Sequence, residues 1–395
     1  MGTSSVYDFE ARQIDGKDSH VIRRYASTDK LADLAKDLKR TVFRPDAESA
    51  AVIRYIDTRK LYFGKSESAA TLAPFTFFRK TWMKKIGFLL LALATAGVTW
   101  AAQPLLSPLE LQAQLKEAKL LVIDIRDAKS YAKQHIPGAL SAPYGSWRGP
   151  ASNPGELPDL PKLTALVQSL GLTAATHAVV VSSGADATDF GATARVYWTL
   201  KVLGLKELSI LNGGVKAWTK SGLPLDNLPV KVSASNYAPQ LEHHLIAARA
   251  DIVPQISTGK LNLVDARPAN FFNGETRHPA AKLPGTIKGA INLEHSKWFV
   301  PGSALFVSAA EAKKIAAATP LDAQRDTVSF CNTGHWAATN WFALSEMVDQ
   351  KNVKLYPGSV VDWTQAENRL PMANVPGRAT QLLIDVKLWV AKIGK

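Results

Sequence analysis

The sequence repeats its own pattern at a spacing of about 140 residues, and this repeat limits the possible folds more than any other feature. Residues 120–126 (LLVIDIR) and residues 261–267 (LNLVDAR) are both apolar runs that end in Asp-x-Arg. A short apolar run of this kind is typical of a buried strand. The sequence therefore predicts two copies of one domain, each built around such a strand.

The two copies share further motifs in the same order. The matching pairs are residues 134–139 with 285–290, the apolar runs 177–181 with 326–330, and the strand, glycine turn and tryptophan segments 210–218 with 355–363. Strands that alternate with helical patterns favour a parallel sheet that is covered on both faces. We therefore expect an α/β fold of two tandem domains, each a mainly parallel sheet with helices on both faces.

The repeat also sets the expected boundaries. We expect a first domain at residues 104–221, a linker at 222–245, a second domain at 246–372 and a C-terminal helix at 373–395. The linker contains proline and serine, which favour irregular backbone between packed elements.

The chain has a single cysteine, Cys331, so its thiol cannot form a disulfide within the chain. It follows the apolar run 326–330 and heads a short loop, residues 331–336 (CNTGHW), before a predicted helix. Backbone N–H groups of such a loop and the start of a helix stabilise a thiolate. A small buried hydrophobe is the alternative interpretation. The first copy has Ser182 and Ser183 at the matching position and therefore has no thiol.

Together, the Asp-x-Arg strands, the His-Ile-Pro-Gly-Ala box at 135–139, the cysteine-headed loop and the closing glycine and tryptophan segments resemble those of tandem-domain rhodaneses. That family consists of thiosulfate and 3-mercaptopyruvate sulfurtransferases. The resemblance implies an enzyme that moves a sulfane sulfur through a Cys331 persulfide. The donor would be an anion such as thiosulfate or 3-mercaptopyruvate, and the acceptor would be cyanide or a thiol. The resemblance also implies an inactive first copy and no cofactor.

An anionic donor requires cationic groups that face the thiol. The resemblance assigns this role to Arg267, and an ion pair with Glu275 is the alternative for its guanidinium. We expect Asp265 to orient loops by hydrogen bonding, and Arg277 and Lys282 to add positive charge. The remaining expected contacts to the substrate are the loop residues Asn332, Thr333, Gly334, His335 and Trp336. In the first copy, Trp147 and Arg148 are candidates for closing the cleft between the domains.

Several other functions are disfavoured. A cysteine phosphatase needs an arginine after five residues that follow the loop cysteine, and at that position this chain has Ala337. The formal net charge of +13 is spread along the chain without a basic and aromatic patch, which argues against nucleic-acid binding. No histidine and cysteine spacing fits a metal site. In the rhodanese family, relatives that prefer thiosulfate carry basic residues just after the cysteine, and those that prefer mercaptopyruvate carry small ones. Asn332 and Thr333 fit neither pattern, so the sequence does not assign the donor. A non-catalytic, membrane-associated module that binds sulfur is the alternative function. The oligomeric state cannot be predicted.

The first 101 residues carry other signals. Residues 5–16 and 20–38 resemble the two ends of a glutathione peroxidase, and we interpret residues 1–41 as a remnant without that family's active site. Residues 42–82 have no assignment. Residues 83–101 resemble a signal peptide, with Lys84 and Lys85 before a short apolar run. We therefore expect a periplasmic or exported protein, with membrane anchoring through residues 86–102 as the alternative.

Overall fold

The computed structural model describes residues 7–15, 18–26 and 102–393, and it divides the chain into two compact units, residues 1–97 and 98–395. In the first unit, strand β1 (Tyr7–Asp15) pairs antiparallel with β2 (Asp18–Ala26). The hairpin falls within the expected peroxidase remnant, which stays a prediction. Residues 42–82 and 83–101 lie outside the described residues. Among the helices that the structure describes, none is both long and apolar enough to cross a membrane.

The first copy of the repeat is a five-stranded parallel sheet in the order β3-β7-β6-β4-β5. Its strands are β3 (Leu105–Leu106), β4 (Leu120–Asp124), β5 (Leu140–Ser141), β6 (His177–Val181) and β7 (Leu208–Leu211). Its α-helices are α4 (Pro108–Gln114), α5 (Ala128–Lys133), α6 (Leu160–Ser169), α7 (Ala187–Val202) and α8 (Gly214–Lys220). Successive β6 residues alternate between the two hydrophobic clusters that flank the sheet, as the two-residue period of a strand requires.

The second copy repeats this arrangement with four parallel strands in the order β10-β8-β11-β12. The strands are β8 (Leu261–Asp265), β10 (Ile291–Asn292), β11 (Asp326–Phe330) and β12 (Val353–Leu355). A parallel bridge from Ile246 to Leu355 takes the edge position that β3 holds in the first sheet. The α-helices of this copy are α9 (Arg249–Ile256), α10 (Ala269–Phe272), α11 (Ala309–Ala317), α12 (Trp336–Phe342) and α13 (Ser359–Gln365).

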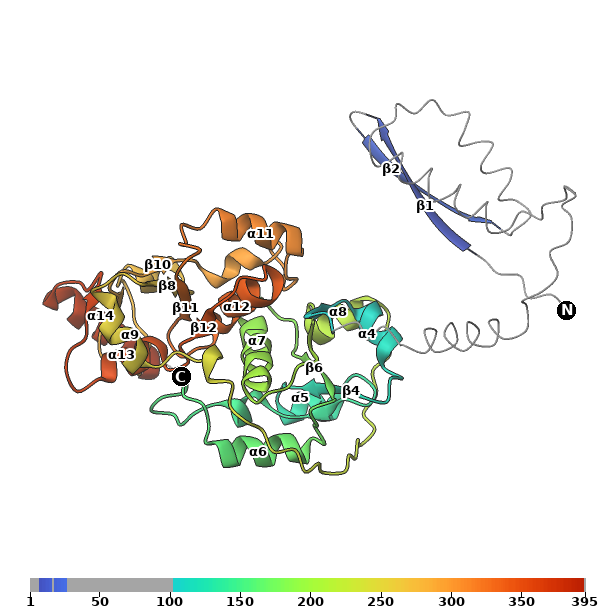
Figure 1. Cartoon of the computed structure of the whole chain (residues 1–395), viewed down its shortest axis with the longest axis horizontal. Coiled ribbons are helices and arrows are strands. Elements are labelled where there is room, and N and C mark those ends of the chain that lie inside the picture. The colour runs from blue at the N-terminus through green and yellow to red at the C-terminus, as the bar shows by residue number, and fades with distance from the viewer. Residues whose placement is uncertain (1–6, 16–17, 27–101, 394–395) are drawn as a thin grey trace, which may run out of the picture. The chain divides into compact units, whose positions relative to one another are not determined.

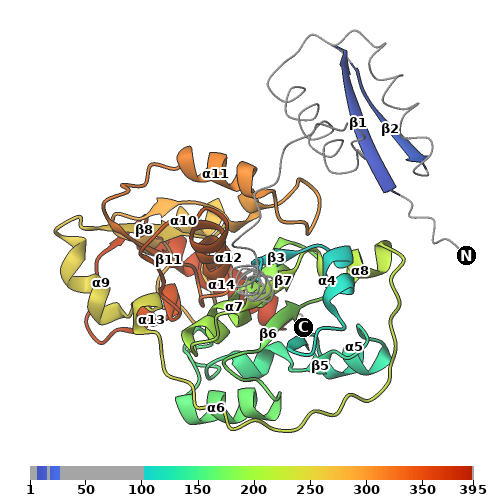
Figure 2. The same ribbon diagram turned by 45° about the vertical axis from the view of Figure 1, so that its right-hand side comes forward.

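Both sheets carry helices on both faces, which confirms the predicted α/β architecture. In the first copy α6 and α7 cover one face, and α4, α5 and α8 cover the other. In the second copy α11 and α12 lie on one face, opposite α9 and α13. The two copies meet through α7 and α12, which lie side by side at the centre of Figures 1 and 2. One hydrophobic cluster runs through this contact, so the two inner faces share a core.

The segment that joins the two copies is largely irregular, and a helix ends the segment that follows them. From Gly222 to Glu242 the chain forms no helix, and it makes one isolated bridge, between Asp226 and His135. After the second sheet, β13 (Met372–Ala373) pairs antiparallel with β9 (Thr286–Ile287). The C-terminal helix, α14, spans Arg378–Ile393 and therefore begins later than the expected residue 373. The delay follows from the backbone before it, because Met372 and Ala373 are extended in β13 and Asn374 has a φ of 57°, outside the range of a right-handed helix.

Candidate active site

Cys331 is the first residue after β11, where the strand turns into the loop that leads to α12. Its exposed fraction is 1%. Its carbonyl oxygen accepts a hydrogen bond from the N–H of Val360, and that of Asn332 accepts one from Val361. The cysteine loop is therefore held against the start of α13.

Ser359 lies directly behind the loop. Its hydroxyl oxygen accepts hydrogen bonds from the N–H of Cys331 at 3.0 Å and from the N–H of Gly334 at 3.1 Å, while the hydroxyl donates to the carbonyl oxygen of Tyr356. Ser359 has a φ of 55°, a conformation that costs energy for a residue with a side chain. This strain indicates that the position serves the loop geometry.

The sequence prediction missed Ser359, although the repeat contained the signal. In the first copy the N–H of Val215 donates to the carbonyl oxygen of Ser182, as Val360 does to Cys331 in the second. The residue before Val215 is Gly214, with a φ of 57°, so it occupies the position of Ser359. The second copy therefore has a serine at a position where the backbone conformation favours glycine. This contrast is the signal that the side chain of Ser359 is needed for the loop.

Gly334 gives the loop its curvature. Its φ is 65°, and an added Cβ would lie 2.5 Å from the carbonyl oxygen of Pro357 and 2.6 Å from Nη1 of Arg195. No other residue fits this position without moving its neighbours. The tight turn exposes the carbonyl oxygens of Thr333 and Gly334 to the first copy.

Two arginines of the first copy hold these carbonyl oxygens. Arg148 Nη2 donates to Thr333 at 2.8 Å, and Arg195 Nη1 donates to Gly334 at 3.3 Å. Arg195 is fully buried, and burial lowers its pKa to about 9, with the charge of Arg148 as the next cause. Arg195 therefore still carries its charge at neutral pH. The copy without a thiol thus places positive charge at the loop of the other copy.

His335 connects the loop to the first copy through both ring nitrogens. Nδ1 lies 2.9 Å from the hydroxyl of Tyr144, and Nε2 lies 2.7 Å from the carbonyl oxygen of Thr188. A carbonyl oxygen only accepts, so Nε2 carries the proton and Tyr144 donates to Nδ1. Burial, followed by the charge of Arg148, lowers the pKa of His335 to about 3. The imidazole is therefore neutral at physiological pH.

Trp336 is part of an aromatic group beside the loop. Its ring stacks on His295 at 4.9 Å between centroids and meets the edge of Phe271 at 5.9 Å. Its indole N–H donates to the hydroxyl of Thr188 at 3.3 Å. His335 and Trp336 therefore both bond to Thr188, which lies at the N-terminal end of α7. The sequence placed both residues at the site without showing that the first copy holds them.

Arg267 differs from its expected position. Its guanidinium bonds to Asp265 through Nη2 at 2.6 Å and Nε at 2.9 Å, and also to the carbonyl oxygen of Gly285. The exposed fraction of its side chain is 1%, and Nη1 reaches Oδ1 of Asn332 at 3.3 Å. Its ion pair is thus with Asp265 and not with Glu275. The charge of Arg267 is thus paired with Asp265, and its remaining side-chain contact to the loop is with Asn332, while its role toward a donor stays a prediction.

Asp265 binds two neighbouring side chains, and its predicted role in orienting the loops stays a prediction. Besides binding Arg267, its carboxylate accepts a hydrogen bond from the hydroxyl of Thr286 at 2.7 Å. Arg126 and Asp124 form the same pair in the first copy, also at 2.6 Å. The Asp-x-Arg motif is therefore a structural feature of both copies.

The other supporting residues lie on the connection after α10 and are engaged elsewhere. Arg277 bonds to Asp385 of α14 at 2.7 Å and to the carbonyl oxygen of Ala281. Glu275 Oε1 accepts a long hydrogen bond from Asn273, and Lys282 is exposed. Within the described part of the chain, none of these three side chains bonds to a loop residue.

The matching site of the first copy is closed by its own side chains. Ser182, at the position of Cys331, donates to Oδ2 of Asp189 at 2.8 Å and accepts a hydrogen bond from Thr193 at 2.8 Å. Oδ2 of Asp189 also accepts from the N–H of Gly184 at 2.6 Å. The carboxylate of Asp189 therefore occupies the loop of the first copy that matches the Cys331 loop of the second.

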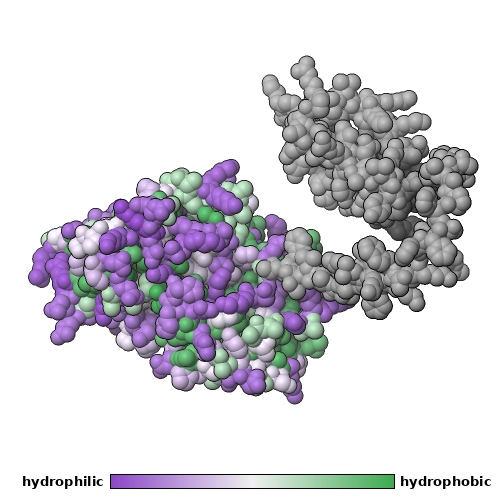
Figure 3. Space-filling view, in the orientation of Figure 1, coloured by the Kyte–Doolittle hydropathy of each residue, from purple (hydrophilic) through white to green (hydrophobic). Residues whose placement is uncertain are grey.

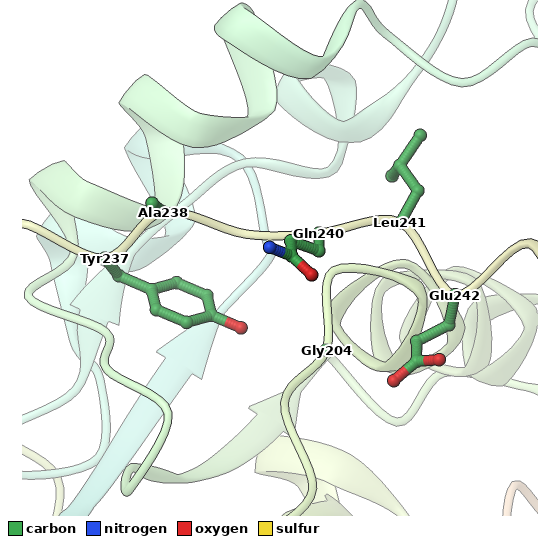
Figure 4. A pocket seen from close by; sticks show the side chains of 6 residues that line it. All are labelled: Gly204, Tyr237, Ala238, Gln240, Leu241 and Glu242. Atoms are coloured by element: carbon green, nitrogen blue, oxygen red, sulfur yellow. The ribbon is translucent and has the colours of Figure 1, made fainter.

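A surface cavity of about 320 Å³ lies away from this site, against the connection between the copies. Figure 4 shows the residues that line it, which are Gly204, Tyr237, Ala238, Gln240, Leu241 and Glu242. It contains no thiol, and the hydroxyl of Tyr237 bonds to the carbonyl oxygen of Leu203. The Cys331 loop, with the thiol and with Arg148 and Arg195 beside it, is therefore the candidate active site.

Comparison with known proteins agrees with this geometry. The model of the rhodanese-like domain matches residues 107–221 and 250–366. A Mycolicibacterium smegmatis protein named "Putative thiosulfate sulfurtransferase" is 30% identical over 264 residues, which cover 64% of this chain and 91% of that protein. The 3-mercaptopyruvate sulfurtransferase of Rattus norvegicus is 27% identical over 284 residues, which cover 68% and 91%.

Among solved structures, that of SseA from Escherichia coli superposes with a TM-score of 0.58 at 23% identity. The superposition covers 65% of this chain and 99% of SseA, and at this identity it supports the fold alone. The family model covers more than half of this chain in two successive matches. The chain therefore belongs to the rhodanese family, of which it carries two domains in tandem.

Proposed function

We propose that this protein is a sulfurtransferase that carries sulfane sulfur as a persulfide on Cys331. The observation that carries the proposal is the loop itself, where the only thiol of the chain heads a tight turn whose carbonyl oxygens are held by two arginines of the other copy. Within the described residues, the N–H groups of Asn332, Thr333 and His335 bond to no protein oxygen. They are available to an anion beside the sulfur.

The first half-reaction loads the cysteine. The Cys331 thiolate attacks the outer sulfur of thiosulfate, the S–S bond breaks, and sulfite leaves with the bonding electron pair. With 3-mercaptopyruvate the C–S bond breaks instead, and the leaving enolate of pyruvate takes up a proton. In both cases Cys331 becomes a persulfide anion. The loop N–H groups can stabilise this product, because they donate hydrogen bonds to a negative charge and undergo no proton transfer themselves.

The second half-reaction removes the sulfur from Cys331. Cyanide or a thiolate attacks the outer sulfur of the persulfide, and the Cys331 thiolate leaves with the electron pair of the S–S bond. Cyanide gives thiocyanate, and a thiolate gives a new persulfide. Because one thiol both receives and gives the sulfur, no second cysteine is required.

The anionic character of the donor is supported by the charges near the loop. Arg267 is fully engaged by Asp265, so the cations that remain at the loop are Arg148 and Arg195. Relatives of this chain are named for thiosulfate and for 3-mercaptopyruvate, and both compounds are anions. We propose one of these two as the donor.

The test is thiocyanate formation from cyanide with each donor in turn. We expect turnover with at least one donor and, after donor alone, one added sulfur atom on Cys331 by intact mass and peptide mapping. Cys331→Ser should abolish both signals. Ser182→Ala, the matching change in the first copy, should retain them. Full activity of Cys331→Ser would refute the proposal, and negligible turnover with every donor would favour a non-catalytic sulfur-binding module.

We further propose that the protein is exported, with residues 83–101 as a cleaved signal peptide. The support is the sequence pattern of two lysines, a short apolar run and small residues at its end. N-terminal sequencing of the protein isolated from its source should give a start at Ala102. An intact residue 83–101 segment in a membrane fraction would favour the anchor instead.

A further inference from the structure

Half of the large hydrophobic side chains that are exposed in the described residues belong to one helix, α14 (Arg378–Ile393). They are exposed by 49% to 65% and comprise Leu382, Leu383, Val386, Trp389, Val390 and Ile393. The others are scattered over the rest of both copies. On the face shown in Figure 3, hydrophilic residues cover most of the surface and hydrophobic ones lie between them. Isolated apolar residues are ordinary on a protein surface, whereas a group of six on one helix is not.

The six side chains form one continuous stripe. At about 100° per residue, they fall within about 120° of the helix circumference, centred on Val386. Ile384, the buried residue of the helix, points in nearly the opposite direction. The helix therefore has two apolar sides, of which only one is packed against the protein.

Polar contacts fix the helix with the stripe facing outward. Asp385 accepts a hydrogen bond from Nη2 of Arg277 at 2.7 Å, and Gln381 donates to the carbonyl oxygen of Pro376 at 2.7 Å. Both residues lie outside the stripe on the helical wheel. The exposed stripe is thus part of the docked conformation.

The charges beside the stripe are positive. Lys387 lies along one flank, and Arg378 and Lys392 lie along the other. The one acidic residue of the helix, Asp385, is paired with Arg277. Trp389 lies at an edge of the stripe, where an indole can reach both an apolar and a polar layer. The helix also begins beyond residue 366, where the second match to the family model ends, so it is an addition to the common domain.

We propose that α14 is a docking helix for an anionic phospholipid surface, lying in the plane of the bilayer with its stripe in the acyl region. Lysine and arginine beside an apolar stripe match the negative headgroups, and tryptophan is favoured at the boundary. A second copy of this chain is a poorer occupant, because it would bring together two helices with the same positive flanks and two chains of formal charge +13. The proposal does not depend on sulfur transfer.

The test uses hydrogen–deuterium exchange of the full chain with vesicles of phosphatidylglycerol and phosphatidylcholine. The readout must be local to α14, because residues 86–102 are apolar and provide a second possible route to the membrane. We expect peptides from residues 378–393 to become protected with anionic vesicles and much less so with pure phosphatidylcholine. Raising the salt concentration should weaken the protection.

Variants identify the stripe as the cause. Val386→Gln with Trp389→Gln should reduce the protection of α14 by about tenfold or more. Leu109→Gln with Leu228→Gln removes two equally exposed leucines elsewhere and should have no effect. Unchanged exchange of α14 with anionic vesicles would overturn the proposal. Protection of α14 in the absence of lipid would also overturn the proposal. It would mean that a second copy, seen as a dimer in sedimentation, or another part of the chain covers the stripe.

Discussion

Arg148 Nη2 donates a 2.8 Å hydrogen bond to the carbonyl oxygen of Thr333, so a residue of the copy without a thiol holds the loop of the copy that has one. Its guanidinium also lies over the ring of Tyr144, whose hydroxyl bonds to His335. Arg148 therefore affects both the backbone orientation of the loop and the charge near Cys331. The first copy therefore contributes side chains to the candidate site although it has no thiol of its own.

Arg148→Ala is expected to lower kcat/KM for thiosulfate by about 10- to 100-fold, the range expected for loss of a charged hydrogen bond. Arg148→Lys should recover part of this loss, because it restores the charge but not the planar donor. The measurement is the initial rate of thiocyanate formation over a range of thiosulfate and salt concentrations. The variant should also show a weaker dependence of kcat/KM on salt than the wild type.

Lys201→Met is the matched control for Arg148. Lys201 also belongs to the first copy and also bonds across to the second, to Oε2 of Glu346 at 2.6 Å, but at a site away from the loop. If Arg148→Ala and Lys201→Met lowered kcat/KM equally, the role of Arg148 would be to hold the two copies together and not to act on the loop. We expect Lys201→Met to change stability while its kcat/KM and salt dependence stay close to those of the wild type.

Ser359→Ala should destabilise the protein and impair persulfide formation. It removes the acceptor for the N–H groups of Cys331 and Gly334 and keeps a side chain at a φ of 55°. A buried N–H without a partner costs about 1–3 kcal/mol. Ser359→Gly removes the same acceptor but relieves the backbone strain, so it should be more stable than Ser359→Ala by about 1 kcal/mol. Urea unfolding of both variants measures the difference, and equal stability would contradict the strained role of the position.

The repeat made most of the fold predictable. Two matched sets of apolar strands and Asp-x-Arg ends indicated two parallel sheets, and the lone thiol after residue 330 indicated the candidate nucleophile, which stays a prediction. The spacing of apolar residues indicates which segments form strands and helices, so these elements could be predicted from the local sequence. The start of α14 could not be predicted from the local sequence, because the pairing of Met372 with Ile287, far apart in the chain, keeps the preceding backbone extended.

The surroundings of the thiol could not be predicted in the same way. Tyr144, Thr188 and Arg195 reach the loop only because α7 packs against α12, a contact between residues far apart in the sequence. Arg267 was assigned to the donor from its place in a motif. A motif does not show that Asp265, two residues earlier, already occupies the guanidinium.

Arg267→Gln is expected to lower the free energy of unfolding by about 3–5 kcal/mol, because it leaves the buried carboxylate of Asp265 without its partner. It should also reduce sulfur transfer from thiosulfate and 3-mercaptopyruvate by similar factors, since its contact with the loop is through Asn332. Arg126→Gln breaks the same pair in the first copy and should destabilise without that loss of transfer per folded molecule. An effect limited to a higher KM for thiosulfate, the dianionic donor, would instead indicate that Arg267 binds the donor directly.

His335 should make the stability of the protein fall as the pH is lowered. In the folded protein its pKa is about 3, because the ring is buried and faces the charges of Arg148 and Arg195, whereas an unfolded histidine titrates near its usual 6.5. Below about pH 6.5 the unfolded chain therefore binds a proton that the folded protein does not. The stabilising contribution is complete above this pH and is lost between about 6.5 and 3, at up to about 1.4 kcal/mol per pH unit.

The variant His335→Gln isolates this effect. A glutamine amide can donate to the carbonyl oxygen of Thr188 and accept from Tyr144, but it does not titrate. Urea unfolding of both proteins at pH 7 and pH 4.5 should show a smaller loss of stability in the variant. His177, His278 and His295 also have a lowered pKa and are present in both proteins, so their contributions cancel in the comparison. An equal loss in both proteins would mean that protonated His335 is accommodated between the two copies, contrary to its neutral state in the structure.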